Sequence, residues 1–277
     1  MILDGKMCSQ IIKDKLKKEI QTFKITPKLI DIQIGDNEAS EIYIANKAKA
    51  AMSVGIDFEC IRFTNNNTEL EIINKIEELN KDDKVFGILI QLPIHPKFNY
   101  KKIVNAISFK KDVDGLTDIN VGKLNNNNDG LVSCTPLGII ELLKYYKIEL
   151  LGKNVVIVGR SNLVGKPLIN LFLNEDATLT ICHSKTSNLE YFTKNADVLI
   201  VAVGKKHLIT KNMVKKGAVV IDVGINRVDN KIYGDVDFDN VKEIVSYISP
   251  VPGGVGPMTI AMLLSNVVKS YKFDKLD

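Results

Sequence analysis

The segment Val155-Val-Ile-Val-Gly-Arg-Ser-Asn-Leu-Val-Gly-Lys-Pro167 decides the fold. Four apolar β-branched residues end at Gly159, and a polar turn and Gly165 lead into the helix-like run 168–173. This order predicts a strand, a tight turn and a helix start, whose N–H groups and dipole attract phosphate. The turn departs from G-x-G-x-x-G because Ser161 replaces the second glycine and the last glycine comes one residue late. A nucleotide site and a plain strand–helix turn are both open on this segment alone.

The next predicted strand, residues 177–182, bears on the choice of nucleotide. NAD sites usually carry Asp or Glu at the end of this strand, whereas here it runs into His183-Ser184-Lys185. Arg160 follows the first strand. A cation with hydroxyl donors suits a ribose 2′-phosphate, which an acid would repel. The pattern favours NADP over NAD, and the alternative is an exposed basic turn.

Apolar runs alternate with amphipathic segments in the first half of the chain. Residues 29–34, 56–63 and 85–91 are predicted strands, with helices predicted at 39–54 and 68–79. The strand Leu29-Ile-Asp-Ile-Gln-Ile34 shows alternation of apolar and polar residues. Strands that alternate with helices in this way indicate parallel βαβ units.

The second half repeats this alternation. A helix at 136–146 is predicted to join the halves, and a second βαβ series is predicted from residue 155 to about 236. Residues 110–133 are predicted to be mainly loop. A closing helix is predicted at 258–271, with Pro257 as its first residue.

Composition restricts the class of protein. The 277 residues are 45% hydrophobic and 25% charged, and the net charge of +4 is too weak to indicate nucleic acid but suits an anionic small molecule. No signal-peptide core opens the chain, and the longest apolar run, 198–203, is too short to span a membrane. Scattered histidines and cysteines predict neither a metal site nor disulfides, but buried thiols in a reducing compartment. The cysteines are Cys8, Cys60, Cys134 and Cys182.

Tyr43 and Lys47 are candidates for chemistry, because their i, i+4 spacing places both on one helix face. Lys47 could act as a general acid or base if burial disfavours its charged form. The alternative is an exposed lysine on an ordinary amphipathic helix. Short-chain dehydrogenases also use Tyr-x-x-x-Lys, but C-terminal to their glycine-rich turn, and here the pair precedes that turn. The order excludes that family.

Three further features carry candidate ligand contacts. Gln91 ends a buried strand, where open α/β sheets place ligands, although a polar strand cap is equally open. Asp112-Val-Asp-Gly115 lacks calcium-loop spacing, so it is either an acidic turn or a carboxylate for paired N–H donors of a heterocycle such as a pterin. The glycines of 252–256 form a turn or let a flat ligand approach the backbone.

Eight segments in order resemble the bifunctional methylenetetrahydrofolate dehydrogenase/methenyltetrahydrofolate cyclohydrolase family. They are Tyr43-Ile-Ala-Asn-Lys47, Gly87-Ile-Leu-Ile-Gln-Leu-Pro93, Lys111-Asp-Val-Asp-Gly115, Cys134-Thr-Pro-Leu-Gly138, Gly159-Arg-Ser-Asn-Leu-Val-Gly-Lys-Pro167, Cys182-His-Ser-Lys-Thr186, Ile221-Asp-Val-Gly-Ile-Asn-Arg227 and Pro250-Val-Pro-Gly-Gly-Val-Gly-Pro-Met-Thr259. The resemblance covers nearly the whole chain. Minor departures from the family pattern fall at four loop positions and touch no residue assigned to chemistry. They are His95, Phe109, Ser133 and Lys206.

The resemblance implies a two-domain α/β fold with a cleft between the domains. Residues 1–137, joined by 258–277, would form a catalytic folate-binding domain, and 138–257 a Rossmann-like NADP domain. It also implies a cytoplasmic homodimer. The folate site would contain Tyr43, Lys47, Gln91 and Asp114, bordered by Pro252, Gly253 and Gly256. The NADP site would contain Gly159, Arg160, Ser161, Gly165, Ser184 and Ile225.

Three other interpretations stay open at this stage. One is a monofunctional methylenetetrahydrofolate dehydrogenase, which the presence of Lys47 and Gln91 disfavours. Another is an unrelated NADP dehydrogenase acting on a cyclic hydroxy acid. The last is a non-catalytic NADP-binding sensor, which would have no need of the Tyr43, Lys47, Gln91 and Asp114 set.

Overall fold

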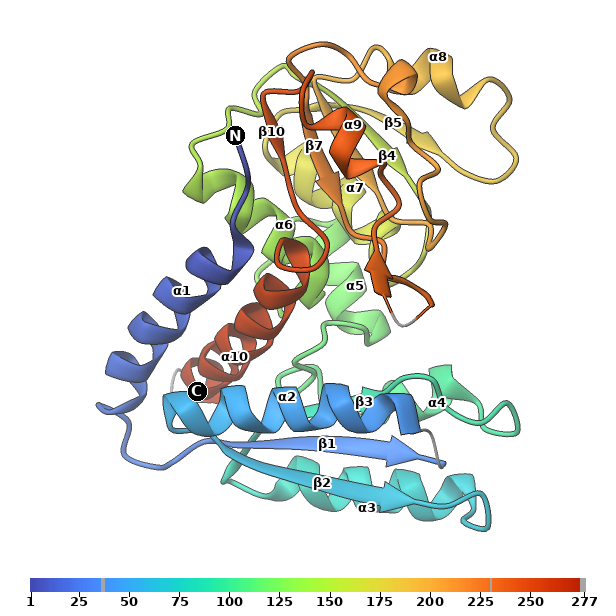
Figure 1. Cartoon of the computed structure of the whole chain (residues 1–277). Helices are drawn as coiled ribbons and strands as arrows, with labels where there is room; N and C mark the ends of the chain where they lie inside the picture. Colours follow the sequence, from blue (N-terminus) through green and yellow to red (C-terminus); the bar gives the residue numbers. More distant parts are fainter. Residues whose placement is uncertain (36–37, 230, 275–277) are drawn as a thin grey trace. The chain divides into compact units, whose positions relative to one another are not determined.

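The computed structural model describes residues 1–35, 38–229 and 231–274. The chain divides into two compact units (Figure 1). The first unit comprises Ile11–Cys134 and Ile260–Asp277, and the second comprises Met1–Gln10 and Thr135–Thr259. Each unit is built on its own parallel sheet.

The first unit contains a three-stranded parallel sheet of order β2-β1-β3. Its strands are β1 (Lys28–Ile34), β2 (Asp57–Phe63) and β3 (Val85–Gln91). Its helices are α2 (Glu38–Val54), α3 (Glu69–Lys81), α4 (Tyr100–Val104) and α5 (Asp118–Asn125), with most of α1 (Gly5–Ile20) and α10 (Val255–Asp274). Thr68 caps α3 in a capping box with Glu71.

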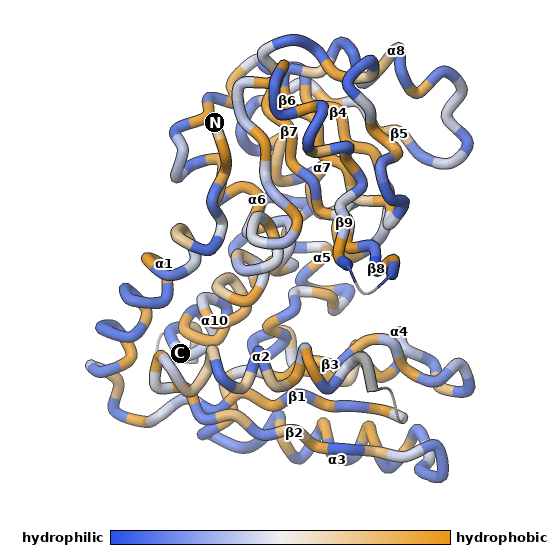
Figure 2. The backbone as a smooth tube through the Cα atoms, viewed as in Figure 1, coloured by the Kyte–Doolittle hydropathy of each residue, from blue (hydrophilic) through white to orange (hydrophobic). Residues whose placement is uncertain are grey.

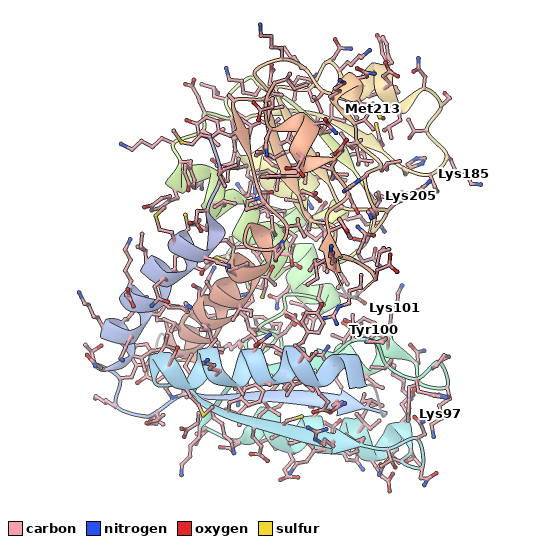
Figure 3. All side chains as sticks on the ribbon, in the orientation of Figure 1. Lys97, Tyr100, Lys101, Lys185, Lys205 and Met213 are labelled. Atoms are coloured by element: carbon pink, nitrogen blue, oxygen red, sulfur yellow. The ribbon has the colours of Figure 1, made fainter. Side chains whose placement is uncertain are left out.

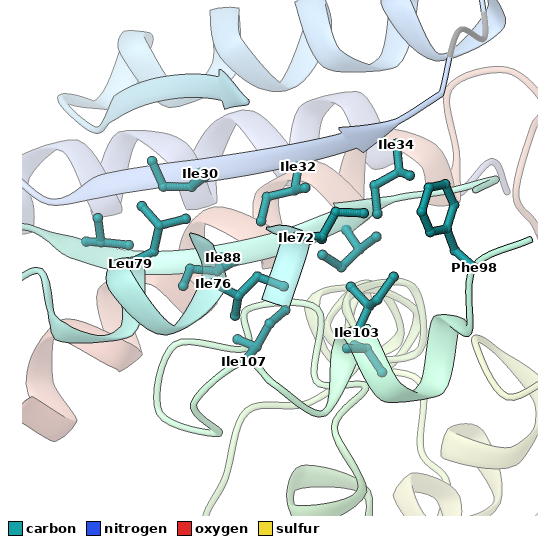
Figure 4. Close-up of a cluster of buried hydrophobic side chains, with 13 residues drawn as sticks. Ile30, Ile32, Ile34, Ile72, Ile76, Leu79, Ile88, Phe98, Ile103 and Ile107 are labelled. Carbon is teal, nitrogen blue, oxygen red and sulfur yellow. The ribbon is translucent and has the colours of Figure 1, made fainter. Parts of the chain in front are cut away.

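One face of this sheet packs on α3 and α4 through apolar side chains. Ile30, Ile32 and Ile34 of β1 contact Ile72 and Ile76 of α3 in a cluster of buried residues (Figure 4). The even-numbered β1 residues line this face because successive strand side chains point to opposite sides. Helix α2 covers the other face (Figure 1), as its contacts with β1 and β3 show.

Gly87 in the middle of β3 allows close packing on the α2 side of the sheet. A Cβ at this position would lie 2.8 Å from Leu29 Cδ1 and 3.0 Å from Val113 Cγ1 and Val267 Cγ2. A larger residue would therefore push the segment containing Val113, and α10 with it, away from β3. The backbone of that segment bridges to β3 between Ile88 and Asp112. Asp112 and Asp114 are thereby fixed along the free edge of β3.

The second unit contains a five-stranded parallel sheet of order β10-β7-β6-β4-β5. Its apolar strands are prominent in Figure 2. The strands are β4 (Asn154–Val158), β5 (Thr178–Cys182), β6 (Val198–Val201), β7 (Val219–Asp222) and β10 (Tyr247–Ile248), with a hairpin of β8 (Asn226–Val228) and β9 (Lys231–Tyr233). The helices are α6 (Cys134–Tyr145), α7 (Gly165–Asn174), α8 (Leu189–Thr193) and α9 (Phe238–Val241), with the 3₁₀ turn η1 (Lys211–Met213). Strand β4 pairs with β5 on one side and with β6 on the other, which is the arrangement of doubly wound folds.

The structure refines one expectation and corrects two. The segment 110–133 is loop-rich as predicted but also contains helix α5, which Thr117 caps through a bond from Asn120 N to Thr117 Oγ1. Helix α10 begins at Val255, so Pro257 is its third residue; a proline is tolerated there because the first-turn N–H groups have no partner within the helix. Cys60 is only partly buried, whereas the other three cysteines are buried.

None of the helices in the described ranges is both long and apolar enough to cross a membrane. A search of the same residues finds no group of three or more His, Cys, Asp or Glu side chains that could hold a metal ion.

Candidate active site

Lys47 lies on α2 one helical turn after Tyr43 and faces the sheet. Its side chain is 12% exposed, so it is not the solvated lysine of an ordinary amphipathic helix. Lys47 Nζ donates a 2.6 Å hydrogen bond to Gln91 Oε1. Gln91 Nε2 donates to the backbone oxygen of Leu92, and this bond leaves Oε1 as the atom presented to the lysine. Tyr43 is 43% exposed, which leaves its ring available to a ligand.

A second partner of Lys47 is Asp31, which the sequence analysis does not single out. Asp31 Oδ2 lies 2.5 Å from Lys47 Nζ, and the Asp31 side chain is fully buried. Burial raises the pKa of the Asp31 carboxyl, while the charge of Lys47 and its hydrogen bond lower it. Alternation in β1 is typical of a half-buried strand, yet both of its faces are covered here. The sequence shows Asp31 only as one of the polar residues of an alternating strand, so its burial could not be found from the pattern.

Asp114 and Asp112 have different surroundings and different roles. Asp112 Oδ2 accepts hydrogen bonds from the Thr117 amide and hydroxyl and from Asn120 Nδ2, so it organises the turn. Among the described residues, Asp114 accepts a 3.7 Å contact from Cys134 Sγ. Burial raises the pKa of Asp114 to about 6, against the lowering effect of the Lys47 charge. The pKa of Asp114 therefore lies closer to neutral pH than that of an ordinary carboxyl group, and its oxygens can still accept hydrogen bonds from a ligand.

Two residues without a predicted role interact with this turn, Asn266 by hydrogen bonds and Tyr100 electrostatically. Asn266 of α10 donates from Nδ2 to the backbone oxygens of Val113 at 2.7 Å and Val132 at 2.8 Å. Tyr100, labelled in Figure 3, has a buried hydroxyl without a hydrogen-bond partner among the described residues. Burial raises the pKa of Tyr100, and the charge of Asp114 adds to this effect. Asn266 could have been found from the sequence, because it is a lone asparagine in an apolar helix. No sequence signal marks Tyr100.

In the second unit, the turns after β4, β5 and β6 meet at one edge of the sheet. Val158 is in register with Cys182 of β5 and with Val201 of β6. The residues that follow Val158 and Cys182 include Arg160 and Ser184, so the parallel register brings both to the carboxyl edge. This edge is where doubly wound sheets bind nucleotides.

The two glycines of the β4–α7 turn are both required by geometry. Gly159 has φ +133°, and a Cβ there would lie 2.4 Å from the Ala202 oxygen. A Cβ at Gly165 would lie 2.3 Å from the Gly159 oxygen and 2.7 Å from Arg160 Cα. The late glycine therefore lets α7 pack against the turn, which is the role of the third glycine in dinucleotide-binding turns.

The edge fits a phosphorylated dinucleotide. Helix α7 begins after Val164, which provides no side-chain cap, so its N-terminal end suits an anion. Ser161 Oγ accepts from Val164 N and orders the turn, with the Arg160 side chain exposed beside it. Ser184 and Lys185 are exposed on the turn after β5, where no acid stands, and Figure 3 labels Lys185. A hydroxyl and cations here match the needs of a 2′-phosphate.

Asp235 is a further residue that carries no prediction from the sequence. It is fully buried and accepts hydrogen bonds from the backbone N–H groups of Val203, Gly204 and Lys205 and from Asn226 Nδ2. These bonds fix the turn after β6 at the carboxyl edge. Ile225, a predicted cofactor contact, is 48% exposed next to Asn226. The sequence of the segment Gly234-Asp-Val236 gives no sign that its acid is buried, so Asp235 could be found only from the structure.

The predicted substrate residues Pro252, Gly253 and Gly256 belong to the second unit. Gly253 has φ +111°, and its oxygen accepts a hydrogen bond from Lys6 N at 3.1 Å. Gly254 N donates to Pro250 O at 2.8 Å, so the loop is internally ordered. The structure thus brings Lys47, Gln91 and Asp114 together in one unit, and places the 252–256 loop in the other.

By fold, the chain falls in the class of two-unit parallel α/β proteins with a doubly wound dinucleotide-binding sheet. The family model for the tetrahydrofolate dehydrogenase/cyclohydrolase catalytic domain matches residues 3–114, and that for the NAD(P)-binding domain of the same family matches residues 133–275. The chain belongs to the tetrahydrofolate dehydrogenase/cyclohydrolase family.

Individual relatives agree over the full length. The bifunctional protein FolD of Fusobacterium nucleatum is 50% identical over 280 residues, which cover 99% of each chain. A crystal structure of the bifunctional FolD methylenetetrahydrofolate dehydrogenase/cyclohydrolase from Campylobacter jejuni has a TM-score of 0.97 and 48% identity, with 99% of each chain covered. The Trypanosoma brucei FolD, solved with NADP cofactor and inhibitor, has a TM-score of 0.94 and 32% identity, covering 100% of this chain and 99% of that one.

Proposed function

We propose that the chain is a bifunctional enzyme of one-carbon folate metabolism. It oxidises 5,10-methylenetetrahydrofolate with NADP⁺ and then hydrolyses 5,10-methenyltetrahydrofolate to 10-formyltetrahydrofolate. The observation that carries the second activity is the hydrogen bond of Lys47 to Gln91 at the end of β3, with the amine largely withdrawn from water. Family membership supports the pairing of the two activities in one chain.

The two reactions place different demands on the protein. Oxidation leaves a cation on a carbon bonded to two nitrogens, whose lone pairs stabilise it, so this step needs positioning more than a protein base. When bound, NADP⁺ supplies the hydride acceptor. Hydrolysis requires water to lose a proton and a ring nitrogen to gain one. Lys47 is the proposed group for these transfers, with Gln91 holding its amine in place.

Other residues are proposed to bind the two ligands. Asp114 would accept N–H donors of the pterin, and Tyr43 would pack along the folate. Gly159, Arg160, Ser161, Gly165, Ser184 and Ile225 would hold NADP, with Pro252, Gly253 and Gly256 bordering the substrate. We propose the domain boundaries implied by the resemblance: residues 1–137 with 258–277 for folate, and 138–257 for NADP.

Replacing Lys47 with methionine tests the division of labour. Lys47→Met keeps the length of the side chain but has no proton to exchange. We expect cyclohydrolase activity to fall by about 10²–10⁴-fold, the usual contribution of acid–base catalysis, with measurable NADP-dependent dehydrogenase activity retained. The measurement follows NADPH formation and then methenyltetrahydrofolate decay. Lys49→Met is a matched control on an exposed position of the same helix. Equal retention of both activities in Lys47→Met would refute the role of Lys47.

Replacing Arg160 with alanine tests the nucleotide preference. A charge-assisted hydrogen bond contributes about 1.5–3 kcal/mol, so Arg160→Ala should reduce the preference for NADP over NAD by about 10–100-fold. The ratio of kcat/KM for the two nucleotides measures this effect. Lys216→Ala removes a charge just before β7, at the amino edge of the same sheet, and should leave the ratio unchanged. Undiminished discrimination in Arg160→Ala would contradict a contact with the 2′-phosphate.

We also propose a cytoplasmic homodimer, as the family resemblance implies. Sedimentation of the purified chain measures its oligomeric state, and a monomer at micromolar concentration would contradict the dimer.

A further inference from the structure

The carboxylate of Asp31 is committed to a single partner. Its Oδ2 atom lies 2.5 Å from Lys47 Nζ, and apart from this ion pair neither oxygen has a hydrogen-bond partner in the described part of the chain. Buried carboxylates usually accept several hydrogen bonds, as Asp112 and Asp235 do in this protein. Asp31 is therefore an exception that the fold does not account for.

Stability does not explain this ion pair. Two charges withdrawn from water lose hydration, and a buried ion pair is often no better than an apolar pair of similar size. The nearest positions on the same sheet face show that apolar residues fit there, because Leu29 precedes Asp31 by two residues and Leu89 lies opposite it in β3. Asp31 makes better sense through its effect on Lys47.

Among the charged groups around Asp31, Lys47 is the cation that pairs with it directly. Arg62 of β2 faces the same side but is held by both oxygens of Glu41 on α2, through its Nη1 and Nη2 atoms. Cys60 of β2 lies in register with Asp31 and is a partly buried thiol. Asp114 adds a further carboxyl that interacts electrostatically with both Lys47 and Asp31. No side chain of β3 on this face titrates, since Leu89 and Gln91 are uncharged.

We propose that Asp31 is a positioning residue and proton acceptor for Lys47: transfer of a proton to Asp31 converts the lysine from ammonium to amine without changing the net charge of the pair. This inference rests on the proposed cyclohydrolase activity. The geometry supports it, since Lys47 Nζ and Asp31 Oδ2 form a direct ion pair of 2.5 Å, which places the two groups within reach of a proton transfer. Burial favours the uncharged form of the Asp31 carboxyl and so lowers the cost of that transfer.

The proton movements balance over one hydrolysis. Transfer from Lys47 to Asp31 frees the lone pair of the amine. The amine accepts a proton from the water whose oxygen bonds to the methenyl carbon. It gives a proton to the ring nitrogen as the bond between that nitrogen and the carbon breaks. The remaining hydroxyl proton leaves to solvent as the formyl group forms, and Asp31 returns its proton to Lys47, which restores the ammonium–carboxylate pair.

Asp31→Asn in the full chain tests the proposal, because asparagine keeps the size but cannot accept the proton. Lys47 must then lose its proton to solvent before it can act. We expect cyclohydrolase kcat to fall at least tenfold at pH 6.5 and to recover toward the unmodified rate by about pH 9, a pH dependence that the unmodified chain lacks. Dehydrogenase kcat should stay within about threefold at each pH, since that step needs no protein base.

Matched variants distinguish the outcomes. Glu59→Gln removes a half-exposed carboxylate that pairs with Lys28 on the other face of the same strands, and should leave both profiles unchanged. A cyclohydrolase profile for Asp31→Asn parallel to that of the unmodified chain overturns the proposal, as does an equal loss of both activities at every pH. If Asp31→Asn does not fold, Asp31→Glu decides: an unchanged profile shape supports proton acceptance, and a new ionisation overturns it. Absence of both activities in the unmodified chain refutes the proposed function instead.

Discussion

The two faces of the β2-β1-β3 sheet share one backbone but differ in chemistry. On the α3 and α4 side, Ile30, Ile32 and Ile34 belong to a continuous apolar cluster. On the α2 side, the alternate residues of β1 include Asp31 and Gln33, both almost fully buried. Along β1, both faces are therefore buried, and the polarity of the buried atoms distinguishes them.

The difference between the two faces shows which kind of buried side chain indicates a functional site. Apolar burial contributes to stability in proportion to the area removed from water. Burial of a charge costs free energy unless a partner compensates it. The α2 face retains that cost at Asp31 and at Gln33, whose Oε1 atom lacks a hydrogen-bond partner among the described residues.

The largest expected effect comes from placing the same carboxylate on the other face. Ile32→Asp would bury a charge with no cation nearby in the apolar cluster and remove a buried apolar side chain. We expect a loss of more than about 5 kcal/mol in the free energy of unfolding of the first unit, or no folded protein. Urea denaturation followed by circular dichroism measures it, with Ile32→Val as the size control at about 1 kcal/mol. A loss for Ile32→Asp as small as that of the valine variant would show that the faces are interchangeable.

A smaller effect is expected from a cavity on the apolar face. Ile76 of α3 is fully buried in the cluster, and Ile76→Ala should lower the free energy of unfolding by about 3 kcal/mol. Leu70 on the same helix is 66% exposed, so Leu70→Ala should change it by less than about 0.5 kcal/mol. Both variants should retain the ratio of the two activities, because neither touches the α2 face. A changed ratio in Ile76→Ala would contradict the separation of roles.

The pH dependence of stability gives the smallest predicted effect. Asp114 has a pKa of about 6, raised above its ordinary value of 3.8, so the folded chain binds more protons between these values. Its contribution to stability is therefore lost as pH rises through this window. Asp114→Asn should gain up to about 2 kcal/mol relative to the unmodified chain between pH 4 and pH 7, while folate affinity falls. Thermal unfolding against pH measures the gain, and a difference independent of pH would contradict the assigned cause.

Sequence reasoning succeeded where local patterns carry the structure. The strands near residues 29–34, 85–91 and 155–158 and the capping of α3 at Thr68 follow from apolar runs and cap residues. It missed α5, because its apolar residues Ile119, Val121 and Leu124 do not recur at the spacing of one helix face. The Asp31–Lys47 pair escaped prediction because alternation cannot say whether the polar side of a strand meets water or a helix.

The sequence by itself determined the order of strands and helices, the glycine turn at 159–165 and the residues Lys47, Gln91 and Asp114 as candidates. Hydrophobic periodicity and turn chemistry are local, so they can be read without a fold. Only the tertiary structure decided that Gln91, 44 residues from Lys47, accepts its hydrogen bond and that Asp31 lies beside both. Parallel register and helix packing make those contacts, and neither is encoded in any single stretch of the chain.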